Sequence, residues 1–584
     1  MKKRVLALLI MCAMLLTLLA ACGSSSDSST STSSSSSSSE TEETSEEAEE
    51  EAGEAEEAEA ESEETAEEAE EAEEEAEAEA EAETVVITYP VTEEVVTYTL
   101  SYSAFSVISM MLENGYSDSP FYDAFEEATG VRFEATLYES TTYEEKMNLL
   151  IVSQSLPDVI GGLLSIYTNG AAQAIEEETA LDITPYLETC MPDYLAAINQ
   201  FEGGLASLTT DEGGMGAIYK VYTEDYAYSN GYFIRDDMLE ATGMDVPETL
   251  DEFLDLLRAL KANGVEYPLY VNTDGDETGV LMDIWFNEWG YMNWYWDVET
   301  ESVQYSHVQD YNYDYMLWLQ DVWEEGLFLS SGAADVMGMS ESFNDLFILD
   351  QVAVFTGKID TIDEELQSLS TETGATAIPF FTGEYTEQGE LMSIVGQESV
   401  SVNADVEDPE TLLKAINYLY TEEGSHLTTY GVEGIGFEYN EDGEEEYTDL
   451  IMNNENVAQR FAMAYYTSPT LPGLYDPYAI SYTWSEHAQA ASEVWESAYT
   501  GNSATFDESV ITLTEDEQDV INLYMSDLDT YCTETLYKFV YNASSLTEET
   551  FDDFVDTCYN TLHLQDILDV YTDAWLRYLE RMEG

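Results

Sequence analysis

The sequence predicts an α/β protein built on a largely parallel sheet. Val95–Phe105 and Val131–Tyr138 alternate β-branched or aromatic residues with polar ones, which is typical of strands. Pro120–Thr129, between them, has a helical pattern, and Thr142–Gln154 is a second, amphipathic helix. A short apolar strand, Pro157–Gly162, follows. This order of strands and helices indicates parallel strands with helices on both faces of the sheet.

The same alternation continues along the chain. Met215–Tyr222 and Gly231–Ile234 are predicted strands, and Arg235–Thr242 is a short predicted helix. A capping-box pattern in Pro247–Phe253 opens another helix, which runs to Asn263. We further expect strands at Pro268–Val271, Val352–Phe355 and Leu391–Val402, helices at Val280–Trp289 and from Pro409, a hairpin at Trp294–His307, mostly helix from Leu427, and a long helix capped by Thr512–Gln518.

The N-terminus has the features of an export signal. A basic start, Met1–Arg4, precedes an apolar run that ends at Ala21, so residues 1–21 are a predicted signal peptide. The run is too short for a comfortable membrane-spanning helix of about 20 residues. Leu19–Gly23 resembles the bacterial lipobox, which implies acylation of Cys22 and a lipid-anchored protein on the outer face of the cell membrane. An ordinary signal peptide with an incidental cysteine is the alternative.

Residues 22–84 are predicted to be a disordered tether. Ser24–Ser39 is nearly all Ser and Thr, and Glu40–Glu83 contains 26 Glu with no Lys or Arg. Such a composition buries no apolar surface, and its like charges repel one another. The segment either holds the folded part away from the membrane or only confers solubility.

The folded part is strongly acidic. The whole chain carries a formal charge of −108, and about −84 remains after the signal and tether are removed. This charge repels phosphate backbones and therefore argues against nucleic acid as a partner. A neutral or cationic ligand fits better than a polyanion, unless the site is locally basic or holds a metal.

Cysteine and aromatic content add two expectations. Of the five cysteines, Cys12 leaves with the predicted signal and Cys22 is the predicted lipid site. The other three, Cys190, Cys532 and Cys558, are an odd number with no CxxC spacing, so we expect buried free thiols rather than a disulfide framework. The chain has 42 Tyr against 20 Phe, which indicates many rings with one edge in contact with water. Such rings suit a site for a ligand rich in hydroxyl groups, although core packing explains many aromatic residues equally well.

Four local patterns carry a family resemblance. They are Ser155–Ile160 after a helix, Gly231–Gly243 followed by Pro247–Phe253, Thr421–Gly424 with Tyr430–Gly434, and the stretch that begins Leu513–Glu517. In this order, behind a lipobox, they resemble the extracellular solute-binding proteins of carbohydrate-type ABC importers, in the large Gram-positive form. The resemblance spans about Val95–Leu579. Asp236 and Asp237 depart from it, because many relatives carry basic residues there.

The resemblance implies a two-lobed periplasmic-binding-protein-like fold of type II, with a helical C-terminal region. The expected lobes are residues 95–218 with 395–432, and residues 219–394 with 433–584. The expected hinge crossings lie near Tyr219–Asn230, Ile394–Ser399 and Val432–Glu438. A monomer of this kind captures a carbohydrate between its lobes, closes around it and delivers it to the transmembrane subunits of an importer.

Candidate ligand-binding residues lie on segments that this architecture brings to the interlobe site. They offer rings that stack on sugar faces, or polar groups that bind hydroxyls. The candidates are Tyr102, Phe105, Tyr228, Asn230, Trp285, Trp289, Lys358, Gln397, Glu398, Glu433 and Trp484. Packing, or a solvated polar side chain, is the alternative explanation for each.

No cofactor is expected, although calcium is a weak candidate. Asn272, Asp274 and Asp276 place oxygens at alternate positions, as calcium loops do, but the EF-hand glycine and final glutamate are missing. Asn440, Asp442, Glu444 and Glu446 form a weaker set. Zinc is disfavoured, because no two histidines are spaced four residues apart.

Two other classes of function compete with a receptor. A surface glycosidase or polysaccharide lyase needs only a few carboxylates, which this acidic chain supplies anywhere. The sequence lacks the nucleophile-elbow, zinc-protease and phosphate-loop motifs, and we expect no enzyme activity. An adhesive surface protein usually shows repeats, and none is found. The same receptor fold with a peptide or other non-sugar ligand stays open.

Overall fold

The computed structural model divides the chain into two units, Met1–Glu83 and Thr84–Gly584. It describes residues 85–584, apart from 105–115, 202, 224–229, 272–293, 299, 332–341, 360–361, 363–365, 367–373, 380, 382–394, 441–442, 455, 458, 469, 497–505, 509, 543–544 and 584. The predicted signal, Cys22, the tether and the predicted helix Val280–Trp289 therefore lie outside the described residues.

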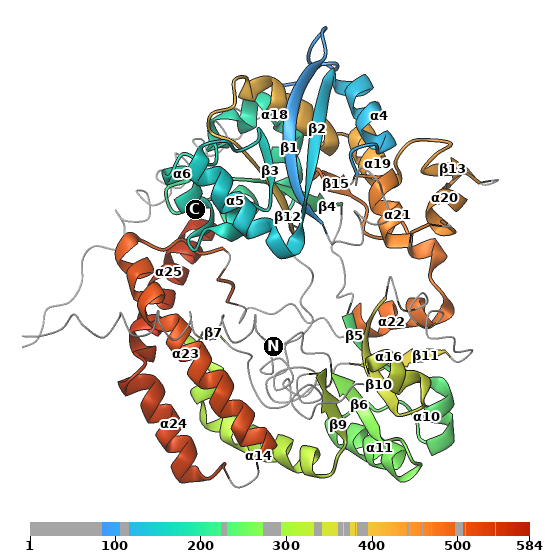
Figure 1. The fold of residues 1–584 in the computed structure, drawn as a ribbon, viewed down its shortest axis with the longest axis vertical. Helices are drawn as coiled ribbons and strands as arrows, with labels where there is room; N and C mark the ends of the chain where they lie inside the picture. Colours follow the sequence, from blue (N-terminus) through green and yellow to red (C-terminus); the bar gives the residue numbers. More distant parts are fainter. Residues whose placement is uncertain are drawn as a thin grey trace, which may run out of the picture. The chain divides into compact units, whose positions relative to one another are not determined.

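Six strands form the first sheet (Figure 1). In their order across the sheet they are β15 (Leu474–Tyr475), β4 (Ile218–Tyr222), β12 (Val395–Val402), β3 (Val159–Gly161), β1 (Val96–Ala104) and β2 (Val131–Glu139). All pairs are parallel except those of β12, which runs antiparallel to both β3 and β4. The largely parallel sheet predicted from the first strands is thus confirmed.

The second sheet has five strands and the same design. Their order is β11 (Ala375–Ala377), β5 (Asn230–Arg235), β10 (Val352–Lys358), β6 (Tyr267–Val271) and β9 (Phe328–Ser330). Again one strand, β5, is antiparallel to its neighbours. Two separate hairpins pair β7 (Trp294–Asp297) with β8 (Ser302–Tyr305), and β13 (Phe437–Tyr439) with β14 (Glu445–Tyr447).

Helices pack around both sheets. Those interleaved with the first-sheet strands are α4 (Pro120–Thr129), α5 (Tyr143–Ser153), α6 (Gly170–Glu176), α7 (Leu187–Cys190), α8 (Pro192–Ile198), α9 (Gly204–Ser207), α18 (Pro409–Asn417), α19 (Glu422–Tyr430), α20 (Asp449–Met452) and α21 (Gln459–Tyr466). Those interleaved with the second-sheet strands, or following β15, are α10 (Asp236–Thr242), α11 (Leu250–Ala262), α14 (Asp310–Glu324), α16 (Phe343–Ile348) and α22 (Glu486–Glu496). The chain closes with α23 (Glu515–Tyr541), α24 (Glu548–Asn560) and α25 (Leu564–Glu583).

Local sequence signals fix the helix ends. The first helix, α4, stops at Gly130, whose φ of 79° is a left-handed conformation that glycine adopts without strain. In α23 the Thr514 hydroxyl accepts from the Glu517 backbone N–H, and the Glu517 carboxylate accepts from the Thr514 backbone N–H. This capping box satisfies backbone groups that a bare helix end leaves unpaired, as the sequence predicted.

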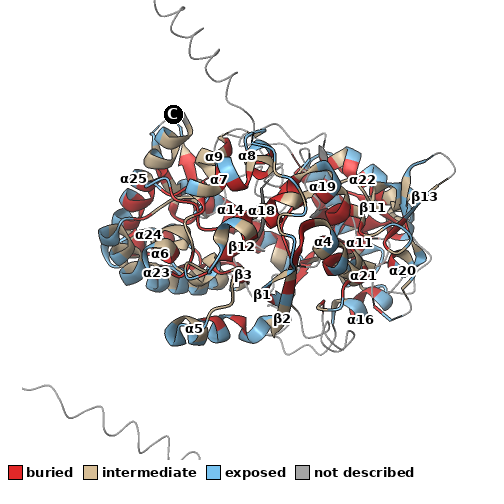
Figure 2. Cartoon of the chain, turned by 90° about the horizontal axis from the view of Figure 1, so that it is seen from above, coloured by how far each residue is buried: buried red, intermediate tan, exposed pale blue. Residues whose placement is uncertain are grey.

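Each sheet is covered on both faces. On β3, Val159 packs into the core with α4, α8 and α18, whereas its neighbour Ile160 packs with Tyr143 and Met147 of α5 on the other face. On β5, Ile234 faces the core that includes α11, and Phe233 faces α16 and α22. Figure 2 shows the resulting pattern, with buried residues along the strands and exposed residues on the outer helices. Alternate residues of each strand therefore serve two different helical layers.

One predicted boundary is wrong. The second lobe was expected to resume at residue 433, after a crossing at Val432–Glu438. Instead β15 pairs with β4 in the first sheet, and α21 packs on α4. No sequence pattern indicated this pairing, because β15 has only two residues. The third connection between the sheets therefore lies between Tyr475 and Glu486.

Candidate functional site

Three chain connections between the two sheets start and end on adjacent elements. They join β4 to β5, β11 to β12, and β15 to α22. In the first sheet the three strands involved, β15, β4 and β12, are consecutive neighbours. In the second sheet β11 pairs with β5, and α22 packs on β11. The connections are therefore gathered at one edge of each sheet, as a hinge requires.

The direction of the strands shows which ends of the sheets the connections use. Because β5 is antiparallel to β10, its first residue, Asn230, lies opposite Lys358, the last residue of β10. In the first sheet, Val395 at the start of β12 lies opposite Val221, near the end of β4. The connections thus run between the carboxyl ends of the parallel strands. Ligands of open α/β sheets bind beyond these ends, so this region is the candidate site.

Helix α22 is held tightly against the second sheet. The Trp495 indole N–H donates to the Ile378 carbonyl at 3.0 Å, and its ring packs on Phe233 with 5.2 Å between ring centroids. Gly231 makes room for it, because a Cβ atom there would lie 2.2 Å from the Trp495 ring. Gly231 therefore allows α22, the helix after the third connection, to pack closely on β5, the strand after the first connection.

Four of the sequence candidates lie at these connections. Asn230 and Lys358 face each other in the β5–β10 pairing, and the Lys358 side chain is exposed. Gln397 and Glu398 lie in β12 where its register against β4 shifts, between Val395 and Ser399. Such bulges re-aim side chains and are common beside binding sites. The side chains of residues 230 and 395–398 are outside the described set, so their roles stay predictions.

Trp484 lies on the corrected third connection. Its ring meets Tyr478 edge-on at 6.3 Å and packs against the core that contains α22 and β10. Its indole nitrogen is buried and has no hydrogen-bond partner among the described residues. This packing attaches the segment that leaves the first sheet to the core of the second, and a contact between Trp484 and a ligand stays a prediction.

Two candidates have different surroundings. Tyr102 is buried in β1, where its hydroxyl accepts from the Tyr116 backbone N–H at 2.8 Å and its ring stacks on Tyr116. Burial raises the pKa of Tyr102, so the hydroxyl stays neutral. Glu433 is exposed next to the β13–β14 hairpin, a segment that the corrected topology assigns to the first sheet.

The remaining candidates cannot be placed. Phe105, Tyr228, Trp285, Trp289 and the calcium candidates Asn272, Asp274 and Asp276 lie outside the described residues. Within the part of the chain that the structure describes, no group of three or more His, Cys, Asp or Glu side chains is arranged to hold a metal ion. Of the second calcium set, Asn440 donates its amide to Glu444 and Glu446 within a hairpin turn.

Sequence reasoning missed a lysine beside the connections. Lys220 on β4 lies over the Tyr475 ring of β15, 4.3 Å from its centroid, and 5.3 Å from that of Tyr222. The signal was a basic residue within an alternating strand of a chain poor in basic residues. Such a contact stabilises the positive charge and orients both rings near the ends of β4 and β15.

A family model described as bacterial extracellular solute-binding protein matches residues 112–425, which is more than half of the chain. The chain belongs to this family. Lipoprotein LipO of Bacillus subtilis (strain 168) is 23% identical to this solute-binding protein over 367 residues, which cover 59% of this chain and 68% of LipO.

Solved structures show the same two-lobed fold. The alginate-binding protein AlgQ2, without calcium ion, superimposes with a TM-score of 0.63 at 17% identity, over 83% of this chain and 98% of that one. FusA of S. pneumoniae in complex with kestose gives a TM-score of 0.60 at 16% identity, over 83% of this chain and all (100%) of that one. The family and these neighbours are binding proteins rather than enzymes.

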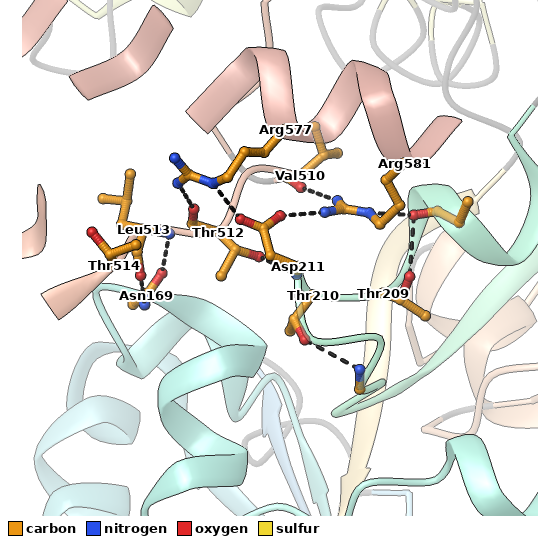
Figure 3. Close-up of polar contacts among 12 residues, drawn as sticks. Asn169, Thr209, Thr210, Asp211, Val510, Thr512, Leu513, Thr514, Arg577 and Arg581 are labelled. Carbon is orange, nitrogen blue, oxygen red and sulfur yellow. Dashed lines mark hydrogen bonds and ion pairs between the residues drawn. The ribbon is translucent and has the colours of Figure 1, made fainter. Parts of the chain in front are cut away.

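In this solute-binding protein a second contact joins a segment beside the first sheet to helices α23 and α25. We call it the arginine joint, and it consists of Asp211, Glu517, Arg577 and Arg581. Figure 3 labels Asp211, Arg577 and Arg581. Asp211 precedes β4, and its carboxylate accepts from Arg577 at 2.6 Å and from Arg581 at 2.5 Å. Arg577 also binds Glu517 at 2.7 Å. Since α23 and α25 share a core with the second sheet, the joint links that region to the first sheet.

Further polar contacts surround the joint. Arg581 donates to the carbonyls of Ala206 and Val510, and Arg577 donates to that of Thr512. The Asn169 side chain exchanges two hydrogen bonds with the backbone of Leu513, at 2.7 and 3.0 Å. Burial opposes ionisation of Glu517, but hydrogen bonds from Arg577 and the Thr514 backbone outweigh it and hold its pKa below the usual value. Charge-assisted bonds of this kind are the stronger class.

Proposed function

We propose that the protein captures a carbohydrate outside the cell and delivers it to the transmembrane subunits of an ABC importer. The observation that carries the proposal is the gathering of three connections at the carboxyl ends of two sheets, each with one antiparallel strand. This arrangement lets two rigid halves rotate about adjacent strands and enclose a solute. The ligand then binds the closed state more tightly than the open one.

The carbohydrate assignment rests on chemistry at the connections and on the neighbours. Trp484 offers a ring for an apolar sugar face, and the exposed Lys358 offers a hydrogen-bond donor for hydroxyls. AlgQ2 is an alginate-binding protein and FusA is in complex with kestose, so the fold accommodates acidic and neutral saccharides. The strong negative charge of this chain favours a neutral oligosaccharide.

We also propose that acylation of Cys22 anchors the protein at the outer face of the membrane, with residues 22–84 as its tether. The lipobox-like Leu19–Gly23 and the similarity to a lipoprotein support this. In the described residues, no helix is long and apolar enough to cross a membrane. Replacing Cys22 with Ser should move the protein from the membrane fraction to the culture medium.

The test is a thermal-shift and calorimetric screen of the full chain against kestose, alginate oligosaccharides, a short peptide and calcium. A ligand that binds only the folded state stabilises it by about 2.7 kcal/mol at 100 times Kd. We expect one-to-one binding of a neutral oligosaccharide without its breakdown. Binding of the peptide alone would overturn the carbohydrate assignment, and release of shorter sugars would favour the competing enzyme.

A matched pair of variants locates the site. Trp484→Ala should weaken saccharide binding by about tenfold, because a stacked ring contributes on the order of 1 kcal/mol beyond its buried area. Tyr439→Ala is the control, since this ring is 52% exposed on the β13–β14 hairpin. Equal affinities of the two variants would place the ligand elsewhere.

A further inference from the structure

Two cysteines from different helices are in contact in the C-terminal region. Cys532 lies on α23 and Cys558 on α24, and their sulfur atoms are 3.8 Å apart. Both side chains are buried, with exposed fractions of 1% and 0%. The sequence predicted buried thiols, and Cys190, Cys532 and Cys558 are all buried, but the structure also places Cys532 and Cys558 side by side.

We propose that Cys532 and Cys558 form an intramolecular disulfide that joins α23 to α24 when the chain folds under oxidising conditions. The sulfurs need to approach by about 1.8 Å to reach the bond length of about 2.05 Å. An exported chain meets the oxidising surroundings in which such bonds persist.

Among the described residues, the third cysteine, Cys190, lies in a different core from this pair. Cys190 ends α7 and is buried in the core of the first sheet with Tyr194 and Leu187. Its sulfur contacts the Thr189 hydroxyl at 3.6 Å. Cys532 and Cys558 belong instead to the core that α23, α24 and α25 share with the second sheet. Of the three described cysteines, only Cys532 and Cys558 are therefore in contact with each other.

The surroundings determine when the bond can form. The contact with Cys558 and burial raise the pKa of Cys532, although the Tyr305 hydroxyl donates to its sulfur and lowers it. The reactive thiolate is therefore scarce in the folded protein, and soluble reagents cannot reach it. We infer that oxidation occurs during folding, and that the finished bond resists reductants until the protein unfolds.

The reaction is an exchange with an organic disulfide such as oxidised glutathione. The thiolate of one cysteine attacks a glutathione sulfur and releases one glutathione thiolate. The second cysteine thiolate attacks the mixed disulfide and releases the other. Two protein thiols are oxidised, one glutathione disulfide is reduced to two thiols, and the two protons go to the departing thiolates.

The experiment refolds the full chain from denaturant with oxidised glutathione, blocks free thiols by alkylation and digests with trypsin. Trypsin cuts after Lys538, so Cys532 lies in residues 461–538 and Cys558 in residues 539–577. We expect one species with the summed mass of both peptides, which separates on reduction. Recovery of both peptides singly alkylated, or linkage of either to Cys190, would overturn the proposal.

Variants and stability complete the test. Cys190→Ser should retain the linked peptides, and Cys558→Ser should abolish them. If Cys558→Ser does not fold, Cys558→Ala provides the same comparison, since alanine leaves no polar group in the core. The linked chain should melt on the order of 3 °C above the reduced wild type, because the bond restricts the unfolded chain. Equal melting temperatures would overturn the proposal that the bond joins α23 to α24 in the folded protein.

Discussion

The regions around the two sheets are linked in two ways: by the three backbone connections and by the arginine joint. The connections are set by topology: β15, β4 and β12 are neighbours, so the chain leaves and re-enters along one edge. The joint is set by side chains, with one carboxylate, that of Asp211, between two guanidinium groups. Backbone connections tolerate rotation about φ and ψ, whereas charge-assisted hydrogen bonds hold a single geometry. The first suits a hinge and the second suits a fixed support.

The largest effect should come from disturbing the packing at the connections. Gly231→Ala places a Cβ atom 2.2 Å from the buried Trp495 ring, so the ring or β5 must shift. We expect a loss of about 3 kcal/mol in the free energy of unfolding, measured by urea denaturation. The double variant with Trp495→Phe should lose less stability than the two single variants lose in sum, because the smaller ring leaves room for the new Cβ atom. Simple additivity would show that the two residues do not oppose each other.

Removing the central carboxylate should weaken the joint by less. Asp211→Asn keeps the shape but loses two charge-assisted bonds at a carboxylate that is 20% exposed. We expect a loss of about 2 kcal/mol in stability by the same measurement. The control is Asp123→Asn. The Asp123 side chain is 79% exposed, so its ion pair with Arg132 should contribute less than about 0.5 kcal/mol. Equal losses in the two variants would remove the distinction between joint and surface pair.

The helix cap beside the joint should have a smaller effect. Thr514→Ala removes the hydroxyl that accepts from Glu517 at the start of α23. A loss of about 1 kcal/mol is expected for an N-cap of this type. Thr547→Ala at the start of α24 is the matched control, because it has the same capping geometry away from the joint. A larger loss for Thr514 would mean that the cap also supports the arginines.

The smallest effect concerns acid stability. The folded-state pKa of Glu517 is lowered, so its contribution to stability is present above the unfolded pKa and disappears as pH falls through the folded pKa. Glu517→Gln should therefore flatten the dependence of stability on pH below about 4.3, the usual glutamate pKa. Urea denaturation at pH 7, 5, 4 and 3 measures this. An unchanged slope would show that the carboxylate is not coupled to folding.

The elements with strong local signals were predicted well. The bounds of α4 are those expected, because a proline at its start and a glycine at its end act locally. The β7–β8 hairpin and the capped α23 were also found from their patterns. The two-residue β15 was not, since its pairing depends on β4, more than 250 residues earlier in the sequence. Because β15 belongs to the first sheet, the third connection begins after Tyr475 and not at Val432.

The candidate site was predicted in outline only. Asn230, Lys358 and Trp484 were chosen from their places in the chain, and the structure puts each at a connection between the sheets. Lys220 was missed, because its position over Tyr475 requires β4 and β15 to be adjacent. Glu433 was chosen for a crossing that lies elsewhere. Residues far apart in sequence come together only through strand pairing, which local patterns do not encode.

By itself, the sequence determined the fold class, the ends of the main helices, the acidic charge and the export features, because each depends on residues near one another in the chain. Tertiary structure alone decided the strand order, the place of the third connection, the arginine joint and the contact between Cys532 and Cys558. Each of these joins residues across loops whose closure costs entropy that only cooperative packing repays. Local patterns therefore specify the pieces of this protein, and long-range burial specifies how they meet.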